Sequence, residues 1–332
     1  MTAEHPFAQY VRILGKGPNL SRPLTREETR AAVGMVLRGE VEPVQLGAFL
    51  CLLRVKTETP EEVAGFVEAI RDFMGAAPAA SVDLDWPSYA GKARRLPWYV
   101  LSALLLAENG LRVFMHGAEG HTANRVYTSQ AFAALGLPVA TSLDEAARHI
   151  GAHSLGYMRL EHLCPRLHEV MGLRALLGLR SPIHTVARMI NPFRAPAEVV
   201  SVAHPNYRNV HQEAALLLGQ PNLAVFKGEG GEAERRPEKP CLVQSLHGDS
   251  MRHEDWPPLV TEAPRYEEEL DLARLAAVWR GDADDPYAAA TVAGTAAIAL
   301  RLTGRAASIE EADGMARAMW EGRRRDRLAG AA

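Results

Sequence analysis

Residues 165–192 read PRLHEVMGLRALLGLRSPIHTVARMINP. Apolar residues recur in this stretch at helical spacing, beginning with Leu167, Val170 and Met171, and no strand pattern interrupts them. On both sides of the stretch, the chain alternates short apolar runs with helical patterns. A purely helical stretch inside such an alternation predicts a segment that leaves the sheet and joins other helices, which makes one domain discontinuous.

The N-terminal part of the chain supplies the helices that this stretch is expected to join. Thr25 and Glu28 have the spacing of a capping box, and Thr59 opens a third helix. The apolar residues that follow each of these starts fall on one helical face. We therefore expect a helical domain made of residues 1–76 and about 165–192.

Residues 80–164 and 193–332 show the alternation of strands and helices that is typical of an α/β fold. The runs that we expect to form strands are residues 82–84, 111–115, 199–203, 223–226 and 241–246. Helical patterns lie between them. The sequence therefore predicts a larger α/β domain with a mostly parallel central sheet covered by helices.

The composition limits the kinds of protein that this chain can be. Its 332 residues are 47% hydrophobic, which is enough for a sizeable core, and the formal net charge is only −3. Attraction to nucleic acid would therefore depend on local clusters of cations. No apolar run reaches the length of a membrane span, and three widely spaced cysteines do not indicate a disulfide framework. We expect a cytoplasmic protein with no membrane partner.

Cationic side chains follow four of the predicted strands, where open α/β sheets bind their ligands. The candidate phosphate-binding residues in these loops, and in the helical stretch quoted above, are Lys92, Arg94, Arg95, His116, Arg125, Arg180, Arg188, Arg208 and Lys227. Any single arginine is more often a solvated surface residue, and His116 is equally suited to a structural role. The convergence of four loops favours a positively charged crevice.

The loop YAGKARRLPW at residues 89–98 has one glycine and three cations. Long side chains such as Lys92, Arg94 and Arg95 suit an extended phosphate backbone better than a compact anion. Trp98 offers a face on which a base could stack, a contact worth roughly 1–3 kcal/mol per base. Packing of Trp98 in the core is the equal alternative.

Three carboxylates follow the strand predicted at residues 223–226. Glu229 and Glu232 have the oxygen ligands that Mg²⁺ prefers, and Glu234 lies beside them. Pairing of these acids with Arg235 and Arg236 is the alternative, and it is the one that we favour.

The RALLGLR segment at residues 174–180, the NP that follows it and the HP after the strand at 199–203 resemble the anthranilate phosphoribosyltransferase family, glycosyltransferase family 3, over nearly the whole chain. The resemblance implies a helical domain with a larger α/β domain, assembled as a homodimer through the helical domain. It also implies transfer of a phosphoribosyl group from phosphoribosyl pyrophosphate with Mg²⁺. Arg180 matches a position that contacts the aromatic acid in that family.

The motifs of the donor site depart from the family. Its GTGGD loop falls near Pro87–Gly91, where only the last glycine remains, and its metal-binding DGLDE appears as EGGEA at residues 229–233. The replacements ARRLPW, HGAEGHTANR, LRSPIHT and KGEGGEAE are similar to the divergent branch typified by YbiB. That branch is associated with binding nucleic acid rather than with making tryptophan.

Three hypotheses follow from the sequence. The first is a protein that binds single-stranded DNA or RNA through the phosphate backbone, as a homodimer and with no cofactor. The second is a phosphoribosyltransferase with an unknown acceptor, in which Glu229 and Glu232 would hold Mg²⁺. The third is a dimeric scaffold without either activity. No catalytic residue is assigned, and we favour the first hypothesis because the donor loop has lost its glycines.

Overall fold

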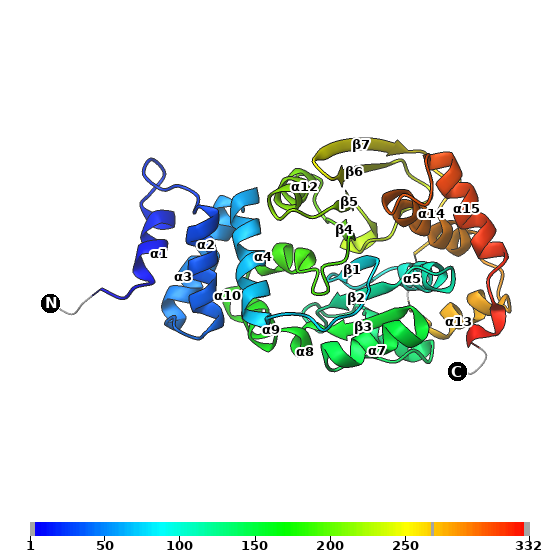
Figure 1. Ribbon diagram of the computed structural model, residues 1–332, viewed down its shortest axis with the longest axis horizontal. Helices are drawn as coiled ribbons and strands as arrows, with labels where there is room; N and C mark the ends of the chain where they lie inside the picture. The colour runs from blue at the N-terminus through cyan, green and yellow to red at the C-terminus, as the bar shows by residue number, and fades with distance from the viewer. Residues whose placement is uncertain (1–3, 267–268, 329–332) are drawn as a thin grey trace.

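The computed structural model describes residues 4–266 and 269–328, and the chain in it begins with a group of helices (Figure 1). These are α1 (Ala8–Gly15), α2 (Arg26–Leu37), α3 (Pro43–Lys56) and α4 (Pro60–Met74). The side chain of Thr25 accepts a hydrogen bond from the backbone of Glu28, and Glu28 caps Thr25 in return, so the predicted capping box forms. Thr59 opens α4 through an equivalent box.

A seven-stranded sheet with the order β3-β2-β1-β4-β5-β6-β7 forms the centre of the rest of the chain. The strands are β1 (Leu84–Ser88), β2 (Val113–Gly117), β3 (Leu155–Arg159), β4 (Ala197–Ser201), β5 (Asn222–Phe226), β6 (Cys241–His247) and β7 (Ser250–Trp256). The first five strands are parallel, and β6 and β7 join them as an antiparallel pair at one edge. The predicted mostly parallel sheet is therefore confirmed.

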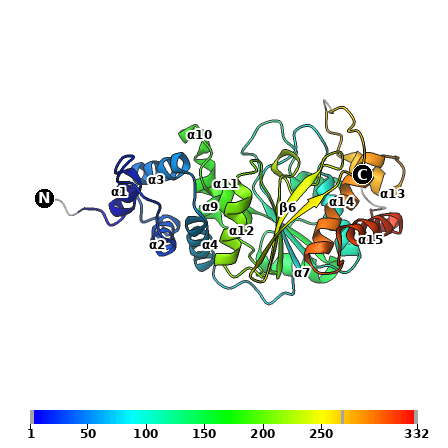
Figure 2. The same ribbon diagram turned by 90° about the horizontal axis from the view of Figure 1, so that it is seen from above.

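The helices that cover the sheet pack into two cores, one on each face. They are α5 (Trp98–Glu108), α6 (Thr128–Ala134), α7 (Leu143–His153), α12 (Tyr207–Leu217), α13 (Ala273–Arg280), α14 (Pro286–Leu302) and α15 (Ile309–Glu321). Successive residues of a strand point to opposite faces. Val200 of β4 accordingly packs in the core of α4, α7 and α12, whereas its neighbour Val199 packs in the core of α5, α13, α14 and α15. Figure 2 shows α4 and α12 on one side of the sheet and α14 and α15 on the other.

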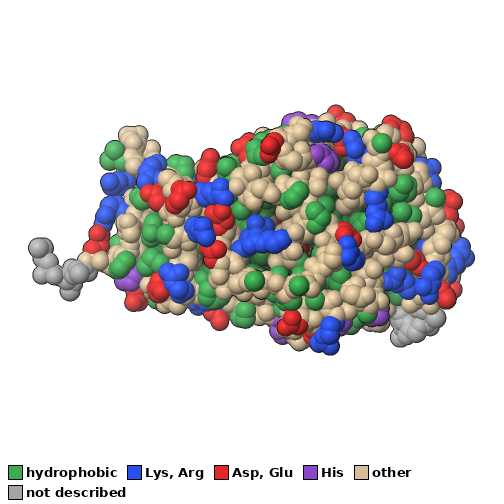
Figure 3. All heavy atoms as spheres, in the orientation of Figure 1, with side chains coloured by type: hydrophobic (Ala, Val, Ile, Leu, Met, Phe, Trp, Pro, Cys, Tyr) green, Lys and Arg blue, Asp and Glu red, His purple; other side chains and the backbone are tan. Residues whose placement is uncertain are grey.

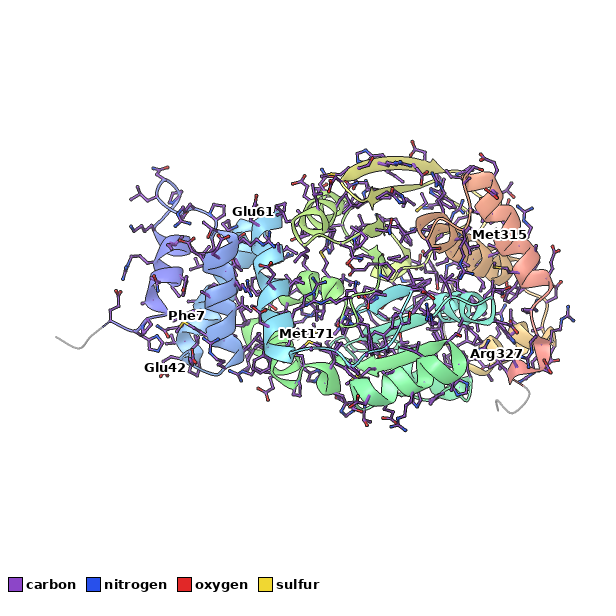
Figure 4. The ribbon with its side chains drawn as sticks, in the orientation of Figure 1. Phe7, Glu42, Glu61, Met171, Met315 and Arg327 are labelled. Carbon is purple, nitrogen blue, oxygen red and sulfur yellow. The ribbon has the colours of Figure 1, made fainter. Side chains whose placement is uncertain are left out.

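The helical stretch around residues 165–192 folds into short helices beside α3 and α4. These are α8 (Leu160–Leu163), α9 (Pro165–Gly172), α10 (Arg174–Leu177), α11 (Ile183–Val186) and the 3-10 turn η1 (Ala187–Met189). Met171, labelled in Figure 4, is buried in the same core as Phe66 of α4. The Nε of Arg71 in α4 donates a hydrogen bond to the carbonyl of Ile190 at 2.8 Å. Because η1 also contacts β1, the division of the chain at residues 165–192 stays a prediction.

Within the described ranges, no helix combines the length and the hydrophobicity that a membrane span needs.

Candidate anion-binding site

The loops that follow β1, β2, β4 and β5 meet at one edge of the sheet, as the parallel strands predict. A nitrogen of the His121 ring, after β2, lies 2.9 Å from the carbonyl oxygen of Tyr89, after β1. The backbone N–H of Gly228, after β5, donates to the hydroxyl of Ser201 at the end of β4, at 3.1 Å. This edge is where an α/β sheet places its ligands.

The carboxylate of Glu232 fills the backbone loop that follows β1. Its Oε1 atom accepts hydrogen bonds from the N–H groups of Ala90 and Gly91, at 2.6 and 2.5 Å. Gly91 has a φ of 67°, and a Cβ there would lie 2.8 Å from the ring of Tyr127, so only glycine fits. Two adjacent N–H groups pointing inward form a nest for an anion. Here the protein's own side chain occupies that nest.

Lys92 is buried beneath this loop instead of facing solvent. Its ammonium group pairs with Glu234, and both side chains are only 1% exposed. The second oxygen of Glu234 accepts a hydrogen bond from the backbone N–H of Tyr99 at 2.9 Å. Burial raises the pKa of Glu234, and Lys92 opposes that rise. The expectation that Lys92 contacts a phosphate backbone is wrong, because its side chain is buried in the ion pair with Glu234.

The two arginines of the same loop have different surroundings. The guanidinium group of Arg95 is buried between the rings of Tyr266 and Tyr287, at 4.8 and 4.6 Å from their centroids. It also donates to the carbonyl of Pro264 at 3.0 Å. Arg94 is exposed and lies 5.1 Å from the ring of Tyr266. The loop therefore presents one cation to solvent, and the expected grip formed by three cations does not exist.

Trp98 and His116 are also corrected by the structure. Trp98 begins α5 and is 2% exposed in the core beside α14, so it cannot stack on a base. His116 is fully buried, with its ring nitrogens 2.8 Å from the hydroxyl of Tyr89 and 3.1 Å from Asp85. In both cases the alternative of a structural role is correct. Both side chains are buried, so neither reaches a ligand at the surface.

Five arginines remain near the sheet edge, where the helical part meets the α/β part. We call them the arginine cluster, and they are Arg54, Arg125, Arg174, Arg180 and Arg188. Burial lowers the pKa of Arg180, and the other four guanidinium groups lower it further. On the face drawn in Figure 3, Lys and Arg side chains are scattered among acidic ones.

Among the described residues, no member of the arginine cluster forms a hydrogen bond or ion pair with a carboxylate, although Glu58 near Arg54 and Glu232 near Arg188 offset part of the charge. Arg125 donates to the carbonyls of Ala90 and Gly91, and Arg174 donates to the carbonyl of His121. The partners of Arg54 and Arg188 are the Tyr207 hydroxyl, at 3.0 Å, and the Gly231 carbonyl, at 3.2 Å. Among the described residues, Arg180 has no hydrogen bond or ion pair. Uncompensated charges of one sign at a partly desolvated site attract anions strongly.

The other two predicted cations lie elsewhere on the same side of the sheet. Arg208 of α12 is half-buried and donates to the carbonyl of Leu242 in β6 at 3.3 Å. Lys227 is exposed directly after β5. Two members of the arginine cluster, Arg54 and Arg174, are absent from the sequence predictions. Arg174 is the first residue of the RALLGLR segment, whereas nothing in the sequence indicates that α3 brings Arg54 to this edge.

The acids predicted for Mg²⁺ do not fit a metal site. Glu232 is held by the backbone N–H groups of the nest, and Glu229 lies 3.7 Å from the guanidinium Nε of Arg236. The described part of the chain contains no group of three His, Cys, Asp or Glu side chains placed to hold a metal ion. Mg²⁺ needs several free oxygen ligands. The pairing of Glu229 with Arg236 is thus confirmed, while Arg235 pairs with Asp313 at 2.9 Å.

The helical part and the seven-stranded sheet together form a fold of the anthranilate phosphoribosyltransferase type. The chain belongs to the glycosyl transferase family whose helical bundle domain matches residues 8–74 and whose α/β domain matches residues 100–322. The resemblance stated from the sequence is therefore confirmed.

Individual relatives agree with this assignment. The chain is 28% identical to the uncharacterized protein YbiB of Escherichia coli K12 over 252 residues, 74% of this chain and 78% of YbiB. It is 30% identical to the anthranilate phosphoribosyltransferase of Methylorubrum extorquens PA1 over 287 residues, 85% of this chain and 81% of that enzyme. The crystal structure of anthranilate phosphoribosyltransferase from Thermus thermophilus has the same fold, with a TM-score of 0.81 at 22% identity, covering 99% and 97% of the two chains.

Proposed function

We propose that this protein binds nucleic acid through the phosphate backbone, largely without sequence preference, at the arginine cluster. The observation that supports this most directly is that five arginines gather at the sheet edge, and that the hydrogen-bond acceptors of those with a partner among the described residues are neutral. Phosphate contacts by arginine supply most of the affinity in nonspecific binding of nucleic acid. The cluster draws its arginines from α3, from the loop after β2 and from the helical stretch at residues 165–192.

The state of the loop after β1 supports the same proposal. In a phosphoribosyltransferase of this family, the resemblance assigns the glycine loop to pyrophosphate. In this chain the carboxylate of Glu232 accepts the N–H groups of Ala90 and Gly91, and a negative charge held there repels a second anion. The arginines that attract phosphates are therefore present, while Glu232 occupies the loop that would bind the pyrophosphate of a donor.

Single-stranded DNA or RNA suits this site better than a duplex. Arg188 is buried and Arg180 only partly exposed. A flexible strand can bend its phosphates toward such recessed groups, whereas a duplex holds its phosphates on a rigid outer surface. A single strand is therefore the form that we propose.

A homodimer through the helical part belongs to the same proposal. Large apolar side chains are exposed there: Val44 and Val55 of α3, and Leu176 of α10, which is 84% exposed. Exposed apolar residues that group on one part of a chain are typical of protein interfaces. A dimer would present two arginine clusters to one strand and raise the effective affinity.

The proposal is tested by fluorescence anisotropy with a labelled single-stranded oligonucleotide of mixed sequence. Arg180→Gln is expected to weaken binding by about tenfold, since one charge-assisted hydrogen bond contributes about 1.5–3 kcal/mol. The matched control is Arg148→Gln, which removes an exposed arginine of α7 and should leave affinity unchanged. Equal weakening by both variants, or no binding by the wild type, contradicts the proposal.

Phosphoribosyl transfer is the second candidate, favoured by membership of the family and by the same arginines, which also suit the phosphates of phosphoribosyl pyrophosphate. Calorimetric titration with that compound, with and without Mg²⁺, separates the two. Saturable heat that depends on Mg²⁺ supports the transferase, and the absence of heat at millimolar donor removes it.

A further inference from the structure

A small cavity lies between α11 and α12, at one side of the arginine cluster. Its volume is about 80 Å³, and it is bordered by Ala203 and His204, which are exposed, so it opens to solvent. The polar residues that line it include Arg54, Arg180, Ser181, His184, Arg188 and His211.

Three polar atoms of residues that line this cavity are buried and have no hydrogen-bond partner in the described part of the chain. They are the hydroxyl of Ser181, in a residue 4% exposed, and the Nε2 atoms of His184 and His211, in residues 8% and 1% exposed. Buried polar groups in folded proteins are nearly always hydrogen-bonded, because leaving one unpaired costs about 1–3 kcal/mol. Three such atoms around one opening indicate that they are the contacts of a ligand.

The size and charge of the cavity define the ligand. A water molecule accounts for about 30 Å³ of liquid, so the cavity holds only a few atoms, whereas pockets for whole small molecules begin at about 300 Å³. The side chains of Arg54, Arg180 and Arg188 contribute three positive charges, which Glu58 near Arg54 and Glu232 near Arg188 offset only in part. A single tetrahedral oxyanion matches both properties, and a base or a nucleoside is too large.

The histidines distinguish between kinds of phosphate. Nδ1 of His211 lies 2.7 Å from the carbonyl oxygen of Tyr207, which can only accept, so Nδ1 carries the proton and Nε2 carries a lone pair. Nδ1 of His184 faces the carbonyl of Ser181 in the same way, at 3.4 Å. Each Nε2 therefore needs a proton from the ligand or from solvent. A phosphodiester has none to give near neutral pH, whereas a phosphomonoester has a second pKa of about 6.

We propose that this cavity, the terminal-phosphate pocket, binds the phosphomonoester at the end of a nucleic-acid strand whose phosphodiesters lie on the arginine cluster. The proposal rests on the proposed function and adds to it a preference for phosphorylated ends. The arginines neutralise the charge of the monoester, Ser181 donates to one of its oxygens, and the histidines share its proton.

The charges around the two histidines agree with this arrangement. Burial, together with His121, Arg180 and Arg188 facing it, lowers the pKa of His184 to about 3. Burial lowers the pKa of His211 to about 4, with Arg188 acting in the same direction. The other titratable groups at the pocket are His204 at its border, Tyr207 and Glu58 beside Arg54, and Glu232, which acts on Arg188. Both rings are neutral near pH 7, so binding takes up a proton and becomes tighter as the pH falls from 8 to 6.

The test compares three oligonucleotides of one sequence, with a 5′-phosphate, a 3′-phosphate or hydroxyl groups at both ends. Anisotropy at pH 6.5 should show about tenfold tighter binding of one phosphorylated strand, from one to two charge-assisted hydrogen bonds. The end that gains affinity identifies the polarity of the strand. The gain should shrink at pH 8 and disappear in Ser181→Ala and in His211→Gln, whereas His247→Gln on β6 keeps it.

Three outcomes would overturn the terminal-phosphate pocket. Equal affinity for all three strands overturns the pocket and leaves the proposed function standing. No binding of any strand overturns both. A preference that survives in Ser181→Ala and His211→Gln, in variants whose thermal unfolding matches that of the wild type, also overturns the pocket. If these variants do not fold, the three strands compared on the wild-type protein still decide between preference and none.

Discussion

The Oε1 atom of Glu232 lies 2.5 Å from the backbone nitrogen of Gly91, although 141 residues separate them in the chain. This contact brings the end of β5 back onto the loop after β1 and closes the nest where a pyrophosphate-binding loop would be open. It explains how a chain with the fold of a phosphoribosyltransferase can keep a cationic edge without keeping a cradle for the donor. The side chain acts as a built-in anion.

Removal of this carboxylate should reopen the nest. In Glu232→Ala, the N–H groups of Ala90 and Gly91 lose their acceptor, and inorganic pyrophosphate should stabilise the variant more than the wild type. At a pyrophosphate concentration of a hundred times Kd, the additional gain is about 2.7 kcal/mol. Thermal unfolding with and without pyrophosphate measures it. Glu229→Ala is the matched control, and equal pyrophosphate effects in all three proteins would mean that the nest is not the anion site.

Lys92 should matter for stability rather than for binding. Lys92→Met leaves the buried Glu234 without its cation, which costs about 3–5 kcal/mol of unfolding free energy. The double variant Lys92→Met, Glu234→Gln should recover much of this loss, because it removes both charges. Denaturant unfolding of the four proteins in the cycle gives the coupling energy. A loss that the double variant does not relieve would show that the pair is not the cause.

The penalty in Lys92→Met should also depend on pH. Burial raises the folded-state pKa of Glu234, so the folded protein binds a proton that the unfolded chain releases. A group of this kind stabilises at low pH, and its contribution is lost as the pH rises through the folded-state pKa. The variant should therefore come closer to the wild type in stability as the pH falls toward 5. A penalty independent of pH would contradict a buried, protonatable carboxyl group.

Trp98 should affect the stability of the protein and not its binding of nucleic acid. Trp98→Ala should destabilise the protein by about 3–5 kcal/mol, since the side chain is buried in the core around α5. Trp98→Phe keeps most of the packing and should bind an oligonucleotide with wild-type affinity. If Trp98→Phe loses affinity while its unfolding temperature is unchanged, the side chain takes part in binding after all.

The proposed homodimer can be tested by placing a charge on its apolar surface. Leu176→Asp places a charge on an exposed apolar position of α10 and should shift the protein to monomer in sedimentation velocity. Met251→Asp introduces the same charge on the exposed edge strand β7 and should leave the assembly as it is. A wild-type protein that sediments as a monomer, or a dimer that survives Leu176→Asp, contradicts the interface.

The sequence predicted most of the fold because its local signals agree with the tertiary structure. The capping box at Thr25 and the helical spacing after Leu167 both correspond to observed helices. Strands β3 and β7 were missed for physical reasons. The helix before β3 ends at Ser154 in the left-handed conformation, where no glycine marks the boundary. Strand β7 is an exposed edge strand, so it has no apolar run.

The site was predicted only in part. Parallel strands place their ends together, so the position of Arg125 at the sheet edge followed from the pattern, and Arg180 of the helical stretch lies near it as expected. The burial of Lys92 and Arg95 could not be predicted, because their partners are distant in the chain: Glu234 lies 142 residues after Lys92. A sequence pattern predicts that a cation in a loop faces solvent, because the pattern does not show which acid or aromatic ring covers that cation in the fold.

The most direct measurement is the salt dependence of binding to a single-stranded oligonucleotide by the wild-type protein. If the strand neutralises its phosphates on the five arginines of the cluster, log K should fall with log salt concentration with a slope of about −3.5, and Arg180→Gln should reduce the slope by about 0.7. A flat response to salt, or a slope that Arg180→Gln leaves unchanged, would contradict the claim that uncompensated arginines at the sheet edge bind the phosphate backbone.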